Sequence, residues 1–372
     1  MRMAIRTHTS APATPAERGE EFGAAHGDAI ATTIERYREL FAHLAGRPVE
    51  LRDAGTEALA TIEAFAAEAA AEIRGIAGGA GLQPWEVAAL NARTEILAGI
   101  GSAAPAECTT VVSLDGATGT PLTMQTWDWH DLFADSWLVW TIEHPDGHVV
   151  HTLTEYGILG KIGVSSRGLG THLNILRHRG DGGPIGVPVH ILARSVLDRA
   201  RNPGEAVALL GSARTSASSA ITLVGDCGGG ATAICAEVAM EGPRFVAPSE
   251  RGLLLHTNHF LDPHLAARDD APRWGPDSYL RLEVLRRRLH DRVPRDREAL
   301  RAVLCDHSGG PNSICCHADP AAELGHRWTT LVTISLDAAN GALWVWPGRP
   351  CEESGRWHVY GSAAADALAP AG

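Results

Sequence analysis

The 372-residue chain almost lacks lysine, which occurs once as Lys161, and its net charge is −12. This negative balance argues against nucleic acid or an anionic membrane as the main partner. The chain has no uninterrupted apolar run of about 18 residues, so the sequence predicts no membrane-spanning helix. It also shows no apolar stretch of a secretory signal near its start. We therefore expect a cytoplasmic protein with reduced thiols.

The seven cysteines are an odd number for a disulfide framework. Two short stretches, 305–307 and 315–317, combine cysteine with histidine and invite interpretation as a zinc site. Their spacing matches no standard zinc finger, because the adjacent Cys315 and Cys316 would point to opposite faces of a strand. We therefore expect neither a metal nor another cofactor. A metal-binding or non-catalytic globular protein remains the alternative to the enzyme described below.

The first hundred residues predict helices. Residues 1–15 are polar and predict a frayed tail. Apolar residues then recur every three or four positions, which indicates one helix around 30–44 and a second over 59–76. Glycines at 78–81 end the second helix, and Pro84 precedes a third helix predicted over 85–100.

From Cys108 onward the pattern becomes that of β-strands. Helices interrupt the strands twice, at 189–210 and at 277–305. Segregated runs of this kind predict an α+β fold in which sheets pack on each other with helices outside. The predicted strands are 111–112, 122–124, 137–142, 149–153, further strands within 157–176, 221–224, 232–237, 253–256, 328–336 and 342–346.

The switch from helix to strand falls at Cys108, and it has two interpretations. Free cysteine is usually an inert core residue, so Cys108 could merely lie near a domain boundary. If the chain is cut before Cys108, however, one residue carries both a thiol and a free α-amine. Such an amine titrates near pH 8, so it can act as the base for its own thiol.

Several motifs resemble those of the penicillin acyltransferase-like family. Members of that family are autoproteolytic N-terminal-nucleophile (Ntn) enzymes related to choloylglycine hydrolases. The similarity covers residues 85–350, and the order and spacing of the motifs are more specific than any one of them. The matching stretches are Leu90-Asn91-Ala92-Arg93-Thr94-Glu95, Cys108-Thr109-Thr110, Thr126-Trp127-Asp128-Trp129, 163–174, His256-Thr257-Asn258-His259-Phe260, 306–315 and Gly348-Arg349-Pro350.

This resemblance implies a four-layer αββα Ntn-hydrolase sandwich preceded by a helical pro-segment. The chain would cut itself between Glu107 and Cys108 into an α-chain, 1–107, and a β-chain, 108–372, which stay together as a heterodimer. A homo-oligomer is also possible. The Cys108 thiolate would then attack a small-molecule amide or acyl thioester. Whether water or an amine removes the acyl group, giving hydrolysis or transfer, stays open.

The resemblance also implies roles for individual residues. Asp128 would accept hydrogen bonds from the region of the Cys108 amine. Asn258 would aim its side-chain N–H at the oxyanion, and Asn174 could add its backbone N–H. Arg281, in Ser278-Tyr279-Leu280-Arg281, would favour the thiolate, although a surface helix arginine is the other interpretation.

Two departures from the family pattern and a group of aromatic residues complete the predicted site. Glu107 stands where the family often has glycine, and Thr126 where it often has asparagine. Thr126, Trp127 and Trp129 are candidates for substrate binding. Tryptophan in strands is usually a core residue, so packing is the alternative for both indoles.

Overall fold

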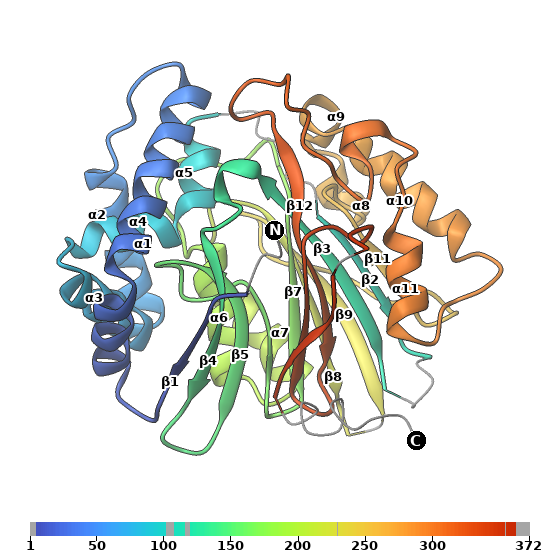
Figure 1. Cartoon of the computed structure of the whole chain (residues 1–372), viewed down its shortest axis with the longest axis horizontal. Helices are drawn as coiled ribbons and strands as arrows, with labels where there is room; N and C mark the ends of the chain where they lie inside the picture. Colours follow the sequence, from blue (N-terminus) through green and yellow to red (C-terminus); the bar gives the residue numbers. More distant parts are fainter. Residues whose placement is uncertain (1–4, 102–107, 116–119, 229, 354, 362–372) are drawn as a thin grey trace.

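Two β-sheets lie face to face in the middle of the molecule, and helices cover their outer faces (Figure 1). The computed structural model describes residues 5–101, 108–115, 120–228, 230–353 and 355–361. None of the helices in these ranges is long and apolar enough to cross a lipid bilayer.

Five helices form the N-terminal part of the chain. The first begins after a capping box, in which Thr14 and Glu17 satisfy each other's backbone N–H groups, and ends at Gly46 with a positive φ of 65°. The two helices predicted over 59–76 and 85–100 are each broken, at Ala66 and Ala92. The helices are α1 (Pro15–Ala45), α2 (Arg52–Phe65), α3 (Ala67–Ala80), α4 (Pro84–Asn91) and α5 (Arg93–Gly99).

Helices α1 and α3 pack closely because glycines meet backbone across the interface. A Cβ added at Gly23 would lie 2.2 Å from the Ile76 carbonyl oxygen, and one added at Gly79 would lie 2.0 Å from that of Glu20. No side chain fits at such distances. Glycine at these positions therefore sets how closely the two helices approach.

The larger sheet has eight strands, and its first strand corrects a prediction. The frayed tail expected over 1–15 contains a strand, β1, which pairs in parallel with β4; the other neighbours are antiparallel. In spatial order the strands are β1 (Thr7–Ser10), β4 (Trp137–Glu143), β5 (Val149–Glu155), β6 (Ile162–Ser165), β7 (Leu169–Ile175), β8 (Ser219–Asp226), β9 (Ala231–Val238) and β10 (Arg244–Val246).

The smaller sheet has six antiparallel strands and carries the predicted nucleophile at the end of one of them. Cys108 directly precedes β2, in which Thr109 pairs with Thr126 of β3. In spatial order the strands are β11 (Leu253–His256), β2 (Thr109–Ser113), β3 (Leu122–His130), β12 (Trp328–Asp337), β13 (Ala342–Pro347) and β14 (His358–Tyr360).

The remaining helices complete the four layers. Helices α6 (Val189–Arg199) and α7 (Pro203–Ser212) contact β6 to β9 of the larger sheet, whereas α10 (Asp277–Arg288) and α11 (Arg297–Leu304) contact β11 and β3 of the smaller one. Between the sheets, β2, β12 and β13 contact β5, β6 and β7. This arrangement confirms the predicted α+β fold of layers α, β, β and α. Besides β1, six short elements were not predicted: the strands β10 and β14, the helices α8 (Pro263–Ala266) and α9 (Ala271–Trp274), and single 3₁₀ turns at Asp131–Phe133 and Gly310–Asn312.

Candidate active site

Cys108 lies buried between the two sheets, with 3% of its surface exposed. Its backbone nitrogen donates to Asn258 Oδ1 at 2.7 Å. Its carbonyl oxygen accepts from Arg281 Nη1 at 3.0 Å and from Asn174 Nδ2 at 3.2 Å. Three residues far apart in the sequence thus hold both polar backbone groups of the predicted nucleophile. Glu107, whose peptide bond to Cys108 is predicted to be cut, lies outside the described residues.

Arg281 lies in α10 and is 2% exposed, so it is not a surface helix arginine. Besides the Cys108 carbonyl, its guanidinium donates to Thr109 Oγ1 at 3.1 Å and to Asn258 Oδ1 at 3.0 Å. An ion pair with Asp277, one turn earlier in the helix, holds the Arg281 Nε at 3.1 Å. Because a guanidinium can only donate, its contact also fixes which side of the Asn258 amide is the oxygen.

Asn258 follows β11 and contacts Cys108 through its side-chain oxygen. Its oxygen faces the Cys108 nitrogen, while its Nδ2 donates to the Ile175 carbonyl at 2.9 Å. The Asn258 backbone nitrogen donates to Ser278 Oγ at 2.8 Å, which ties this loop to the first turn of α10. The amide carries two N–H groups, so one remains for a reacting oxygen.

Asn174 contacts Cys108 through its side chain, whereas the predicted oxyanion donor was its backbone N–H. The Asn174 Oδ1 accepts from Thr110 Oγ1 at 2.7 Å, which orients Nδ2 toward the Cys108 carbonyl. The neighbouring Leu173 turns its backbone groups toward the Gln125 side chain. Since successive strand residues turn their backbone groups to opposite sides, the Asn174 N–H faces β8.

Asp128 lies in β3, close enough to Cys108 for its charge to act on the thiol. It is fully buried and accepts hydrogen bonds from Thr126 Oγ1 at 3.1 Å and Thr330 Oγ1 at 2.6 Å. The predicted binding residue Thr126 therefore orients this carboxylate. Thr330, in β12, gave no signal in the sequence that would link it to the site.

The surroundings of Cys108 keep its thiol protonated while its nitrogen is part of a peptide bond. Burial raises the pKa of the Cys108 thiol to about 12, and the Asp128 carboxylate adds to the rise. The positive charges of Lys161 and Arg281 oppose it. The thiol is therefore a weak nucleophile at neutral pH until a base removes its proton.

A buried ionic cluster, which the sequence did not predict, lies against the indoles of Trp127 and Trp129. Glu155 pairs with Lys161 and with Arg93, the latter at 3.1 Å, and accepts a hydrogen bond from Tyr37. Burial, together with the charge of Arg93, lowers the pKa of Lys161 to about 7. The only signal in the sequence was that Lys161 is the single lysine.

The predicted indoles have cationic partners in this cluster. Lys161 Nζ lies 3.9 Å from the centre of the Trp127 ring, and the Arg93 guanidinium carbon lies 4.1 Å from that of Trp129. Both indoles are nearly fully buried. Trp129 lines a pocket, whereas Trp127 packs inside the molecule.

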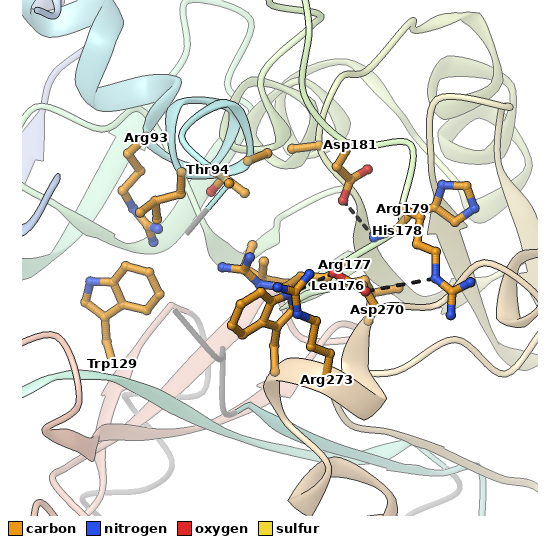
Figure 2. Close-up of a pocket in the computed structure, with 16 residues that line it drawn as sticks. Arg93, Thr94, Trp129, Leu176, Arg177, His178, Arg179, Asp181, Asp270 and Arg273 are labelled. Carbon is orange, nitrogen blue, oxygen red and sulfur yellow. Dashed lines mark hydrogen bonds and ion pairs between the residues drawn. The ribbon is translucent and has the colours of Figure 1, made fainter. Parts of the chain in front are cut away.

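A pocket of about 200 Å³ is lined in part by Ile175, whose carbonyl accepts from Asn258 Nδ2. In Figure 2, Arg93 and Trp129 lie on one side, His178, Arg179 and Asp181 on the other, and Arg177 and Arg273 between them. Positively charged side chains outnumber the two carboxylates. The lining residues are Arg93, Thr94, Leu97, Ala98, Gly101, Trp129, Ile175, Leu176, Arg177, His178, Arg179, Asp181, Ala217, Asp270, Arg273 and Trp274.

Comparison with known proteins connects this geometry to a family. A family model described as acyl-coenzyme A:6-aminopenicillanic acid acyl-transferase matches residues 116–351, starting just after Cys108. A curated protein of Emericella nidulans, the acyl-coenzyme A:6-aminopenicillanic-acid-acyltransferase 40 kDa form, is 31% identical over 288 residues, which cover 75% of this chain and 74% of that protein.

Solved structures with a similar fold are more distant in sequence. A mutant of the conjugated bile acid hydrolase of Clostridium perfringens is 13% identical, with a TM-score of 0.45 over 68% of this chain and 92% of that one. The penicillin V acylase of Agrobacterium tumefaciens is 14% identical, with a TM-score of 0.44 over 69% of this chain and 86% of that one.

Proposed function

We propose that this chain, which belongs to the acyl-coenzyme A:6-aminopenicillanic acid acyl-transferase family, is an autoprocessed cysteine enzyme. It transfers or hydrolyses an acyl group through an intermediate in which that group is bound to the Cys108 sulfur. The best support is the Cys108 nitrogen, 2.7 Å from Asn258 Oδ1. In the uncut chain this nitrogen is an amide. After a cut before Cys108 it becomes an α-amine, which Asn258 holds beside the thiol of the same residue.

The first reaction is self-cleavage. The Cys108 sulfur attacks the Glu107 carbonyl carbon, the peptide bond between the two residues breaks, and the nitrogen takes a proton to become the amine. Water then hydrolyses the thioester, which leaves a carboxylate on Glu107 and restores the thiol. The α-chain, 1–107, stays bound, because its helices share one buried core with the β-chain.

The second reaction is turnover, in which the new amine serves as the base. An α-amine titrates near pH 8, so much of it is neutral at physiological pH and can accept the thiol proton. The guanidinium of Arg281, which contacts the Cys108 carbonyl and Asn258 Oδ1, disfavours a second positive charge on the amine. It thereby favours the neutral, proton-accepting form.

Two side-chain amides that contact the backbone of Cys108 are candidate donors for the developing oxyanion. The second N–H of Asn258 Nδ2 is the main candidate, because its first N–H is taken by the Ile175 carbonyl. Asn174 Nδ2 is a second candidate, since it already donates at 3.2 Å to the Cys108 carbonyl. Donors held in place by other contacts stabilise the transition state without reorganising.

The arginine-rich pocket supports an acyl donor or acceptor with an anionic group. The Emericella relative is named for transfer between acyl-coenzyme A and an amino-substituted acid. In this chain Arg177 and Arg273 lie where a carboxylate could bind, and the indole of Trp129 lines the same pocket. Arginine suits that task because its planar fork matches a carboxylate.

Denaturing electrophoresis with N-terminal sequencing tests the proposal. It predicts pieces of 107 and 265 residues from the 372-residue chain, with Cys108 first in the larger piece. Cys108→Ala should abolish cutting and turnover. Cys235→Ala is the matched control, because that thiol is equally buried but lies in β9 away from the site. An intact chain that turns over acyl substrates, or a Cys108→Ala protein cut at the same bond, would sink the proposal in favour of a structural Cys108.

A further inference from the structure

Four side chains that the proposed reaction does not use converge at the edge of the smaller sheet. His307 and Cys315 lie in the segment between α11 and β12, as does His317, while Cys351 follows β13. One donor atom from each lies within 4.8 Å of the others. All seven cysteines are among the described residues and are free thiols. Two imidazoles and two thiols therefore face one point.

The three separations from His317 match those of a zinc site. His317 Nε2 lies 3.1 Å from His307 Nε2 and 3.5 Å from the sulfur atoms of both Cys315 and Cys351. In a tetrahedral zinc site the bond lengths place nitrogen about 3.3 Å from nitrogen and about 3.6 Å from sulfur. We propose that His307, Cys315, His317 and Cys351 bind one zinc ion.

Neighbouring residues of this segment stay outside the cluster. Cys315 and His317 each offer a donor atom to it, whereas Cys316 between them does not. Cys316 is fully buried in the main apolar core. The sequence pattern had grouped Cys305 and Cys316 with the histidines, and it could not include Cys351, which lies 34 residues beyond His317.

The ligand set makes the site structural, separate from the acyl chemistry. Two cysteines and two histidines fill all four tetrahedral positions, which leaves none open for water or substrate. The ion joins the segment after α11 to the chain after β13. Within that segment, the Cys316 carbonyl accepts from the Thr330 backbone nitrogen, and the Cys316 nitrogen donates to the Thr330 hydroxyl, which itself donates to Asp128. Zinc would thus help to fix the position of the Thr330 hydroxyl that donates to the Asp128 carboxylate.

Arg349 tunes this site. Its Nη1 lies 3.1 Å from His317 Nδ1 and can only donate, so it favours the tautomer whose proton is on Nε2. Zinc at Nε2 requires that proton on Nδ1 instead. In the zinc form Arg349 turns to Glu352, to which its Nε already donates at 2.8 Å. Replacing Arg349 by an acceptor should therefore strengthen zinc binding.

Metal analysis of the full chain, grown with added zinc and then desalted, tests the proposal. We expect one zinc ion per chain. Exchange for cobalt should give the absorption of a tetrahedral site with thiolate ligands. Cys351→Ser and His317→Gln should lose most of the zinc, and a chelator should lower the melting temperature of the wild type but not of these variants. Arg349→Gln should bind zinc about tenfold more tightly.

Matched controls identify the ligands. Cys305→Ser removes a thiol of the same segment that lies outside the four, and Cys227→Ser removes an exposed one; both should keep the zinc and the cobalt spectrum. A zinc-free wild type without a thiolate–cobalt spectrum would overturn the proposal. So would a disulfide between Cys315 and Cys351 in the purified protein, or full zinc content in both Cys351→Ser and His317→Gln.

Discussion

The Asn258 side-chain oxygen lies 2.7 Å from the Cys108 backbone nitrogen and accepts its hydrogen bond. Arg281 donates to the same oxygen at 3.0 Å, and the Ile175 carbonyl accepts from the amide nitrogen. These two outer contacts fix the amide in one orientation. The oxygen therefore faces the Cys108 nitrogen, and we expect the remaining N–H to donate to a reacting oxygen.

Asn258→Asp separates these two tasks. The carboxylate keeps an oxygen near the Cys108 nitrogen but removes the amide N–H groups, so kcat of the processed enzyme should fall about 10²–10³-fold. A negative charge beside the α-amine also stabilises its protonated form. The acid limb of the rate profile should therefore move to higher pH.

The measurement for Asn258→Asp is kcat against pH on processed protein. Asn202→Asp is the control, because Asn202 caps α7 through its side-chain oxygen and aspartate caps a helix equally well. An unchanged kcat and profile in Asn258→Asp would show that the amide neither donates to the oxyanion nor faces the amine.

Asp128→Asn should make the Cys108 thiol more acidic and the enzyme slower. In the uncut chain burial is the main reason for the high thiol pKa, and the Asp128 charge is the second. Removing that charge lowers the pKa, so Cys108 alkylation by iodoacetamide should speed up at a given pH. Turnover should still fall, because the carboxylate no longer orients the site.

Site-resolved mass spectrometry measures this alkylation against pH. In the wild-type molecules that are still uncut, the rate should rise about tenfold per pH unit through pH 9, because burial raises the pKa of the thiol to about 12. Exposed Cys227 is the internal reference, and the exposed Asp115→Asn is the control substitution. A plateau near pH 8 would contradict the buried, neutral thiol.

Arg273→Gln should weaken binding of substrates that carry a carboxylate. Arg273 lines the pocket without a contact to Cys108 among the described hydrogen bonds, so KM should rise while kcat changes little. For a neutral analogue with the same acyl group, KM should stay constant. Arg268→Gln is the control, because Arg268 is exposed and pairs with Glu241. Equal effects on charged and neutral substrates would contradict an anion site.

The sequence predicted the parts of the site that lie next to recognisable motifs. The motifs that resemble the family contain Cys108, Asp128, Asn258 and Arg281. Their order and spacing therefore predicted that these four residues lie in one site. The orientation of Asn258 could not be predicted, since Arg281, 23 residues later, determines it. Thr330 and Glu155 lie in no motif. Their partners, Asp128 for Thr330 and Arg93 for Glu155, are far away in the sequence.

The errors in the predicted fold have local causes. β1 reads Thr7-His8-Thr9-Ser10, with no apolar alternation, and forms because β4 offers it an edge to pair with. The helix breaks at Ala66 and Ala92 carry no glycine or proline, so nothing in their residues marks them. The apolar periodicity continues through both breaks and predicts single helices there.

Lys161→Met should remove a pH dependence of stability. Burial and the Arg93 charge lower the pKa of Lys161 from 10.5 to about 7, so between these values the unfolded chain binds more protons than the folded one. Stability from this group is therefore fully present above pH 10.5 and lost as the pH falls through 7. The stability difference, wild type minus Lys161→Met, should rise between pH 7 and 10.

Urea unfolding of both proteins across that range measures the difference. The comparison is clean because Lys161 is the only lysine of the chain, and other groups that titrate in this range cancel between the two proteins to first order. A difference that stays constant from pH 7 to 10 would mean that Lys161 remains charged in its pair with Glu155.

Two adjacent glycines of α3 test how the N-terminal helices pack. At Gly79 an added Cβ would lie 2.0 Å from the Glu20 carbonyl oxygen and 2.7 Å from the Ala24 nitrogen of α1, so the helices must separate. Gly79→Ala should therefore lower the free energy of unfolding by about 1–3 kcal/mol. At Gly78 an added Cβ meets nothing within 4 Å, and alanine there should stabilise the helix by up to about 1 kcal/mol. Denaturant midpoints of the two variants measure this contrast. Equal shifts would mean that α1 and α3 do not pack at this distance in solution.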